Sequence, residues 1–390
     1  MKLFRSGVRA LAGAAVAMLM GCITSAAAEP RCGAPVGGSD RWSVAANAER
    51  SLDATALCEA LPKFLPADAN LHGIVVEQHG KLQFEAYFDG RDNPGGALFS
   101  RDASFTPDDL HDVRSVTKSI TSLLVGIAIE RGQLKSIDTP VIDFFPELAE
   151  LKTPERSRIT LAHLLTMTHG LDWDESGSYV RLGNSETRMR FASDPDRYVL
   201  ERDIVAPPGT RFNYSGGATA LLGEVLVRST GVPLDRFADE ALFQPLGITH
   251  TEWRRDQKDR VTPFGGLRLR PRDLAKVGRL LLDQGRWQGR QVVPAAWIEE
   301  SLRDRVAAGN ALRYGYQWWR GEIKNKAGSF AWIAGMGNGG QRLFVVPSLD
   351  LVVVITAGQY NQPETSWKAP LLVLRRIVAE LASPSSERTP

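Results

Sequence analysis

The most strongly patterned stretch of the chain is an apolar run from about residue 114 to residue 130. Apolar residues recur there three or four positions apart, at Val116, Ile120, Leu123, Leu124 and Ile127. This spacing marks one face of a helix. Val125 and Ile129 fill the other side, and Gly132 supplies a stop signal. Because a helix that is apolar nearly all round belongs in a core, we expect this helix to be buried.

Strand patterns lie near both ends of the chain. Residues 73–78 and 82–88 predict a hairpin around the glycine turn at 79–81, and later runs predict strands at 314–319, 330–333, 343–346 and 351–356. Helical patterns fill the rest, at 54–64, 161–167, 221–226, 272–283, 294–302 and 366–381. The polar segment 172–190 is expected to be an exposed loop.

Strands at both ends with helices between them predict an α+β fold. One antiparallel sheet would be built from both chain ends and flanked by helices, with a helical subdomain inserted in the middle. The predicted division is an N-terminal arm at 29–70, a sheet domain at 71–137 and 251–382, and a helical subdomain at 138–250.

The N-terminus predicts export. Lys2, Arg5 and Arg9 precede an apolar stretch at 10–20, and small residues at 26–28 suit a cleavage site. These features are typical of a signal peptide at 1–28, so we expect a periplasmic or secreted protein. The run Leu19-Met20-Gly21-Cys22 also resembles a bacterial lipoprotein site. A membrane-anchored lipoprotein with lipid on Cys22 is therefore the alternative.

Two cysteines remain if Cys22 is removed or lipidated. An oxidising compartment would allow Cys32 and Cys58 to form one disulfide that staples the N-terminal arm. The alternative is a pair of free structural thiols.

Composition excludes several classes of function. The chain is 43% hydrophobic and 24% charged, with a net charge of +2 and no basic run, so a nucleic-acid partner is not expected. The six histidines show no helical pairing with a glutamate, and the cysteines lack metal spacing, so no metal is expected. The sequence has no glycine loop of the kind that binds phosphate, so no nucleotide cofactor is expected.

The candidate chemistry lies where the apolar helix begins. Ser115 and Lys118 are three residues apart and share one helix face, which brings a nucleophile beside a base. A serine at a helix start is equally compatible with a simple N-cap. Other motifs must decide between the two interpretations.

Three motifs together resemble the serine β-lactamase and penicillin-binding-protein superfamily. They are Ser115-x-x-Lys118, Tyr214-Ser215-Gly216 and Gly337-Asn338-Gly339-Gly340-Gln341. The segments 113–119, 164–171 and 314–319 are also typical of one group in this superfamily. By these segments the chain most resembles the class C β-lactamase-related serine hydrolases. This group includes family VIII carboxylesterases and 6-aminohexanoate-dimer hydrolase. The resemblance covers roughly residues 70–380 and implies a β-lactamase/transpeptidase-like fold.

The resemblance also implies roles for these residues. Ser115 would form an acyl-enzyme, and burial would lower the pKa of Lys118 so that its neutral amine takes the serine proton. Tyr214 would share protons with Lys118. The backbone N–H groups of Ser115 and Gln341 would form the oxyanion hole. The substrate would approach along Asn338, Gly339 and Gly340.

Two positions depart from the family pattern. Gly216 stands where asparagine is usual, and Asn338 stands where a lysine or histidine usually holds a substrate carboxylate. This argues against β-lactams and D-Ala-D-Ala stems, unless Arg342 on the same strand face supplies the charge. Asp172 and Tyr179 in the 172–190 loop would contact an amine or amide, or the loop would be solvated.

The sequence thus predicts an exported serine hydrolase that cleaves a small ester or amide without a cofactor. One alternative is a β-lactamase or D-Ala-directed peptidase. The other is a non-catalytic binding or cell-wall-sensing module that keeps the fold. The sequence carries no signal for an oligomeric state.

Overall fold

The computed structural model describes residues 32–38, 40, 42–95, 97 and 99–382. The signal peptide expected at 1–28 and the lipid site expected at Cys22 lie outside these residues. None of the described helices has the length and apolar character needed to cross a membrane.

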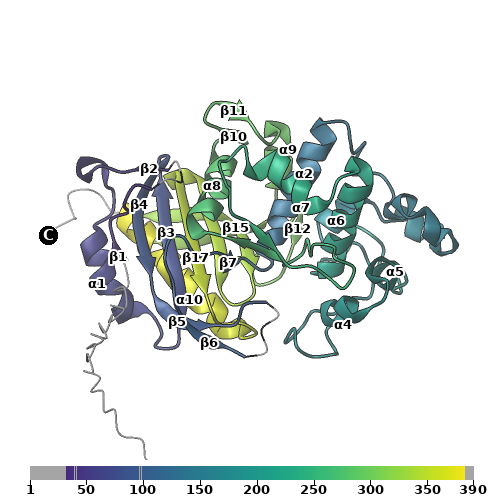
Figure 1. Cartoon of the computed structure of the whole chain (residues 1–390), viewed down its shortest axis with the longest axis horizontal. Helices are drawn as coiled ribbons and strands as arrows, with labels where there is room; N and C mark the ends of the chain where they lie inside the picture. Colours follow the sequence, from purple (N-terminus) through teal and green to yellow (C-terminus); the bar gives the residue numbers. More distant parts are fainter. Residues whose placement is uncertain (1–31, 39, 41, 96, 98, 383–390) are drawn as a thin grey trace, which may run out of the picture.

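A ten-stranded sheet forms one end of the molecule (Figure 1). Its strand order is β1-β4-β3-β17-β16-β15-β14-β13-β12, and β2 joins β4 in parallel while the other pairs are antiparallel. The strands are β1 (Cys32–Gly33), β2 (Ser43–Val44), β3 (Leu71–Gln78), β4 (Lys81–Tyr87), β12 (Val306–Ala307), β13 (Arg313–Tyr314), β14 (Trp319–Asn325), β15 (Gly328–Gly337), β16 (Gln341–Val346) and β17 (Leu351–Ala357). The expected joining of both chain ends is therefore observed, with β3 beside β17.

Helices cover both faces of this sheet. Ile74 and Val76 of β3 pack with helices α1 (Ala54–Phe64) and α10 (Pro363–Ala382), whereas Val75 belongs to the core on the opposite face. That second core contains α2 (Val116–Glu130), α8 (Pro271–Leu282) and α9 (Ala295–Ser301). The strict alternation follows from the two-residue period of a strand.

The opposite end of the molecule is largely helical (Figure 1). Its elements are η2 (Val141–Phe144), η3 (Pro146–Leu151), η4 (Arg156–Arg158), α3 (Leu161–Leu165), α4 (Ser185–Phe191), α5 (Pro195–Leu200), α6 (Gly216–Thr230), α7 (Leu234–Ala238) and η5 (Asp239–Phe243). Gly231 ends α6 in the left-handed conformation, with φ of 71°. Strands resume with β8 (Glu252–Trp253) and β9 (Leu267–Leu269).

Smaller strand pairs complete the fold. The pairs are β5 (Asp89–Asp92) with β6 (Arg101–Ser104), β10 (Arg286–Trp287) with β11 (Arg290–Gln291), and β7 (His111–Asp112) with β9. The short strand β7 leads through three residues, 113–115, into α2.

Two local predictions from the sequence are wrong. The segment 172–190 is not a loop throughout, because Asn184 caps α4 by accepting a hydrogen bond from the Thr187 amide at 3.1 Å. The strand expected at 314–319 is interrupted, because Gln317 takes a positive φ of 65° between β13 and β14.

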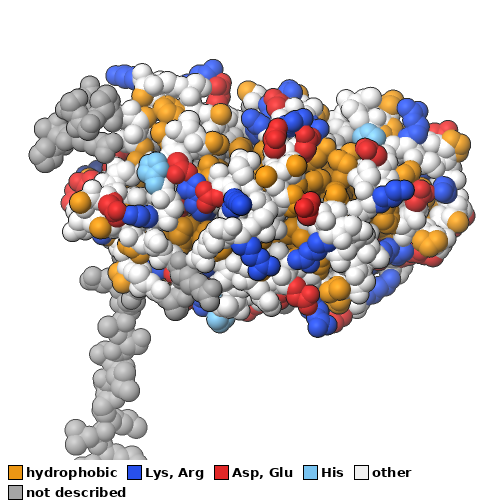
Figure 2. All heavy atoms as spheres, turned by 90° about the horizontal axis from the view of Figure 1, so that it is seen from above, with side chains coloured by type: hydrophobic (Ala, Val, Ile, Leu, Met, Phe, Trp, Pro, Cys, Tyr) orange, Lys and Arg blue, Asp and Glu red, His pale blue; other side chains and the backbone are white. Residues whose placement is uncertain are grey.

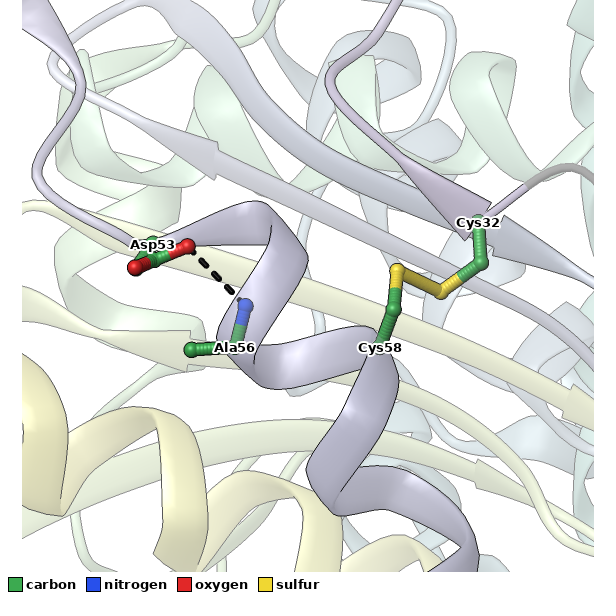
Figure 3. Close-up of a disulfide and its surroundings, with 4 residues drawn as sticks. All are labelled: Cys32, Asp53, Ala56 and Cys58. Carbon is green, nitrogen blue, oxygen red and sulfur yellow. Dashed lines mark hydrogen bonds between the residues drawn. A yellow bond between two sulfur atoms is a disulfide. The ribbon is translucent and has the colours of Figure 1, made fainter.

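The structure pairs Cys32 with Cys58 in a disulfide, as expected from the sequence (Figure 3). Their Cα atoms lie 5.9 Å apart, a distance typical of disulfides. Nearby, the Asp53 carboxylate accepts a hydrogen bond from the Ala56 amide and caps α1. The bond ties α1 to β1, and so fastens this helix to the edge of the sheet.

Candidate active site

The Ser115 side chain does not cap its helix. Ser115 occupies the N-cap position of α2, but its hydroxyl makes no capping hydrogen bond. The preceding residue, Arg114, has a positive φ of 49°, a costly conformation for a long side chain. Contacts on both sides hold it: Nη2 donates to the Asn93 carbonyl at 2.8 Å, and the guanidinium lies 4.4 Å from the Tyr360 ring centroid. The serine hydroxyl is left available for another partner.

That partner is Lys118, whose side chain is only 1% exposed. Its ammonium nitrogen lies 3.1 Å from the Ser115 hydroxyl and 2.8 Å from the carbonyl oxygen of Phe264. The helix turn brings the two side chains together, as the spacing predicts. The Phe264 carbonyl, from the loop before β9, fixes the direction of the lysine.

Tyr214, from the helical part of the molecule, is the third member of this group. It lies just before α6, and the Lys118 ammonium is 5.0 Å from its ring centroid. Burial raises the pKa of Tyr214, while Lys118 and a hydrogen bond with Ser115 act in the opposite direction. The ring also packs against Trp319, with centroids 5.6 Å apart. The structure therefore brings together all three residues that the motifs single out.

Two carboxylates also lie here, the buried Glu186 and the half-buried Glu175, and the sequence analysis missed both. Glu186 on α4 is 2% exposed, with its Oε2 3.9 Å from the Lys118 ammonium and its Oε1 2.5 Å from Arg190. Glu175 accepts hydrogen bonds from the Trp173 indole at 2.7 Å, the Tyr179 hydroxyl at 3.1 Å and the Gly216 amide. Burial and the nearby charge of Glu186 raise the pKa of Glu175 to about 7.

These carboxylates correct the expectation for Lys118. Burial alone would lower its pKa, but the negative charge available on Tyr214, Glu186 and Glu175 outweighs burial, and the pKa of Lys118 is raised. A buried amine becomes a weak acid when anions surround it. Lys118 therefore keeps its proton and is not the neutral amine that the sequence analysis expects.

Gly216 explains how Glu186 fits. A Cβ atom at Gly216 would lie 2.3 Å from Glu186 Oε2, so the Glu186 side chain would have to shift to make room for it. The carboxylate thus fills the space next to the missing side chain of the second motif. This close approach could have been suspected from the departure at Gly216, but nothing in the sequence pointed to Glu186.

The third motif lies beside the start of α2. A Cβ at Gly337 would meet the Val113 carbonyl at 2.4 Å, so the end of β15 approaches the segment before Ser115 closely. Gly339 and Gly340 have φ of 92° and 100°, which favour glycine. The Asn338 side chain exchanges hydrogen bonds with Asn361 at 2.9 and 3.1 Å.

Gln341 turns its side chain away from the serine. Its amide donates to the Ala357 carbonyl and accepts from the Ala357 amide at 3.1 Å, which fixes the start of β16 against the end of β17. Its backbone is paired with Gly337 across the two strands. The Gln341 side chain therefore fixes the position of its own backbone N–H, the group that the sequence predicts for the oxyanion hole.

Two expected substrate contacts are not placed at the site. Arg342 is 5% exposed, and its guanidinium donates to the carbonyls of Gly337, Gln341 and Ser366 at 2.8–3.1 Å. Asn338 and Gly340 precede β16, so the strand face that Arg342 was expected to share with them does not exist. Asp172 is exposed and pairs with Arg202 at 2.9 Å.

Ser115 opens onto a cavity of about 160 Å³. Its lining combines residues from four parts of the chain: Arg114, Ser115, Tyr179, Glu186, Arg190, Arg254, Phe264, Asn338 and Tyr360 among others. A larger hollow of about 710 Å³ adjoins it, and Tyr179, Arg190, Arg254 and Phe264 line both. Tyr179 thus lies at the site as expected, with its hydroxyl directed to Glu175.

Comparison of the chain with known protein families identifies its family. A profile of the family described as Beta-lactamase matches residues 65–372. The chain belongs to the beta-lactamase family. The expectation of a serine hydrolase related to these enzymes is confirmed at the family level.

Two relatives of the chain are named as different kinds of hydrolase. The chain is 29% identical to the 6-aminohexanoate-dimer hydrolase of Paenarthrobacter ureafaciens over 67% of its own length and 69% of the relative. It is 34% identical to the esterase EstB of Burkholderia gladioli, over 45% of this chain and 44% of the esterase. The match to the esterase therefore spans less than half of either protein.

Similar solved structures confirm the predicted fold. EstCE1, described as a hydrolase with promiscuous acyltransferase activity, superimposes with a TM-score of 0.63 at 17% identity, covering 84% of this chain and 98% of that one. The octameric penicillin-binding protein homologue from Pyrococcus abyssi gives 0.60 at 19% identity, covering 87% and 80%. The β-lactamase/transpeptidase-like fold is therefore established.

Proposed function

We propose that this chain is a serine hydrolase that cleaves an ester or amide through an acyl-enzyme on Ser115. The observation that carries the proposal is the 3.1 Å contact between the Ser115 hydroxyl and the buried Lys118, at the wall of a cavity. The names of the two relatives, a dimer hydrolase and an esterase, support both bond types.

The raised pKa of Lys118 suggests how the proton moves. Burial raises the pKa of Tyr214, so its phenolate is a minor form, which the adjacent protonated Lys118 stabilises. That phenolate accepts the Ser115 proton as the serine oxygen attacks the acyl carbon. The acyl–oxygen or acyl–nitrogen bond then breaks, and the leaving group takes the proton from Tyr214. Water attacks the acyl-enzyme by the reverse route and releases the acid.

The oxyanion formed in each step requires donors fixed in advance. We assign them to the backbone N–H groups of Ser115 and Gln341. The tight approach of Gly337 to Val113, and the Gln341–Ala357 bonds, support this assignment. Losing one such donor typically costs about 10²- to 10³-fold in rate.

The test of the nucleophile is intact-protein mass after treatment with a fluorophosphonate, together with turnover of a short p-nitrophenyl ester. We expect one label and turnover, with both lost in Ser115→Ala. Ser122→Ala is the matched control, because Ser122 is buried on the same helix and its hydroxyl has no partner among the described residues. An unlabelled wild-type protein would favour the binding-module alternative.

An arginine in the Ser115 cavity supports the alternative of a peptidase or β-lactamase. Arg254 lines the Ser115 cavity with Arg114 and Arg190. Arg114 has Asp112 at 3.4 Å and Arg190 has Glu186, whereas for Arg254 no side-chain hydrogen bond or ion pair exists among the described residues. Burial and the two neighbouring arginines lower the pKa of Arg254. A substrate carboxylate would compensate this charge in place of the missing basic residue at Asn338.

This alternative predicts a selective effect of Arg254→Gln. We expect at least a tenfold loss of kcat/KM on a p-nitrophenyl ester that carries a distal carboxylate, and little change on its neutral analogue. Arg290→Gln is the control, because it removes the same charge from an exposed strand. Equal losses on both esters would show that Arg254 does not read substrate charge.

We also propose export and the domain division stated from the sequence. The polar N-terminus, the apolar run and the oxidised Cys32–Cys58 pair support an exported protein. The mass of the mature protein tests this directly. Cleavage after residue 28 would support secretion, whereas a diacylated Cys22 would support the lipoprotein.

A further inference from the structure

A second cluster of reactive side chains lies apart from the Ser115–Lys118 group. His72 on β3, Asp92 at the end of β5 and His111 on β7 are 0%, 7% and 3% exposed. Each offers one nitrogen or oxygen atom, and these three atoms lie within 4.8 Å of one another. Three separate strands thus direct potential metal ligands to one buried point.

We propose that His72, Asp92 and His111 bind a divalent transition-metal ion such as Zn²⁺. Two imidazoles and one carboxylate form a ligand set that suits zinc, cobalt or nickel, whereas Mg²⁺ and Ca²⁺ prefer oxygen ligands alone. Three protein ligands leave the fourth tetrahedral position to a water molecule.

The tautomer of His111 already fits this role. Its Nδ1 lies 3.0 Å from the Asp112 carbonyl oxygen, which only accepts hydrogen bonds, so Nδ1 carries the proton. Its Nε2 therefore presents a lone pair, and this nitrogen lies 2.8 Å from Nδ1 of His72. A backbone carbonyl behind a histidine is a common second partner of a metal ligand.

The metal-free arrangement leaves His72 incompletely bonded. Nδ1 of His72 faces Nε2 of His111, and Nε2 of His72 is buried with no hydrogen-bond partner among the described residues. Binding a metal at Nδ1 would require only that the His72 proton leave that nitrogen.

The other ligands are also held in place. The Asp92 carboxylate accepts a hydrogen bond from the Tyr360 hydroxyl at 3.0 Å, and the His72 ring stacks on Phe105 with centroids 4.0 Å apart. Zinc–nitrogen bonds of about 2.0–2.1 Å place two ligand nitrogens roughly 3.3 Å apart. The imidazoles would therefore separate by only about 0.5 Å from their present 2.8 Å.

The position of the cluster indicates what the ion would do. His111 lies four residues before Ser115, on the strand that leads into α2. An ion here would fasten β3, β5 and β7 together and so stabilise the segment that carries Ser115. This role is structural and does not depend on the proposed hydrolase chemistry.

The experiment uses the full, untagged protein stripped with a chelator. Calorimetric titration with Zn²⁺ and with Co²⁺ should give one strong site per chain, and bound Co²⁺ should show the intense visible bands of a tetrahedral site. The metal should raise the thermal midpoint.

Three variants decide the assignment. We expect Asp92→Asn and His111→Gln each to weaken binding at least tenfold and to abolish the Co²⁺ bands. His79→Gln should bind as the wild type does, because His79 is an exposed histidine that pairs with Asp350 at 2.9 Å. If His111→Gln does not fold, Asp92→Asn decides, since asparagine keeps the shape and can still accept from Tyr360. No binding by the wild type, or equal binding by Asp92→Asn, would overturn the proposal.

Discussion

At the scale of single residues, the site is governed by buried charge. Lys118, Glu175 and Glu186 lie close together in a region with little water, so the proton affinities of Lys118 and Glu175 depend on the charges around them. The nucleophile motif placed Ser115 and Lys118 together correctly, because a helix turn fixes that distance whatever surrounds it. The proton affinity of Lys118 depends on carboxylates 57 and 68 positions later in the chain. Local spacing could not reveal them.

Glu175 gives a prediction about stability and pH. Its pKa in the folded protein is about 7, above the ordinary 4.5, so the folded state holds a proton that the unfolded state releases. The folded state binds more protons between these values, and stability therefore falls as pH rises from 4.5 to 7. Glu175→Gln removes this dependence while keeping acceptor and donor groups for its three partners.

We expect the stability of Glu175→Gln relative to the wild type to increase from pH 5 to pH 8 by up to about 3 kcal/mol. Urea unfolding at each pH measures it, and the exposed Glu299→Gln serves as control. A difference that stays constant over this range would contradict the assignment of the raised pKa to Glu175.

At the scale of elements, α4 shows where sequence prediction failed and why. The segment 172–190 is rich in polar residues, which is typical of an exposed loop. Yet Ser185, Glu186 and Met189 of α4 are buried, because Glu186 finds Arg190 and Lys118 as partners inside the protein. A buried charged residue that is paired looks the same in a sequence as an exposed one. The apolar helix α2 carried no such ambiguity and was predicted nearly to the residue.

The packing of α4 against the start of α6 predicts a strong interaction between Gly216 and Glu186. Gly216→Asn alone should destabilise the protein by about 1–3 kcal/mol, because its Cβ would overlap Glu186 Oε2. Glu186→Ala alone should also destabilise it, because Arg190 loses its partner. The double variant should recover at least 1 kcal/mol relative to the sum.

A double-mutant cycle by urea unfolding measures this coupling, and ester turnover of the double variant shows whether an asparagine can act beside Lys118. Gly183→Asn is the control, since a side chain there meets open space. Strictly additive effects would mean that Glu186 does not occupy the space next to Gly216.

At the scale of the whole molecule, the sequence predicted the architecture but not every contact within it. Strand periodicity is a local signal in the sequence. It therefore predicted the β3–β4 hairpin and the late strands, and with them a sheet made from both chain ends. His72, Asp92 and His111 come together only through the order of strands in three dimensions. Charges of both signs are interspersed over the face shown in Figure 2, in keeping with the near-neutral net charge.

The disulfide between Cys32 and Cys58 gives a prediction for the intact protein. It closes a loop with a sequence separation of 26, which should stabilise the fold by about 3 kcal/mol. Replacing both cysteines with alanine should lower the free energy of unfolding, measured in urea, by about that amount. Ester turnover should stay nearly unchanged, because β1 and α1 lie away from α2, which carries Ser115 (Figure 1). Adding a reductant to the wild type should reproduce the shift, and a reductant effect on the double variant would point to another cause.

The pairing of β3 with β17 also bears on how the protein is made. Leu351 lies opposite Gln78, so two neighbouring inner strands of the sheet join segments more than 270 residues apart. Contacts of such long separation form late, since the entropy of closing the intervening loop must be overcome first. A ribosome will have synthesised Ser115, Lys118 and Tyr214 well before β17 emerges. The nascent chain therefore carries its whole reactive group while the sheet that supports it is still incomplete, and hydrolytic activity should appear only after the last strand is released.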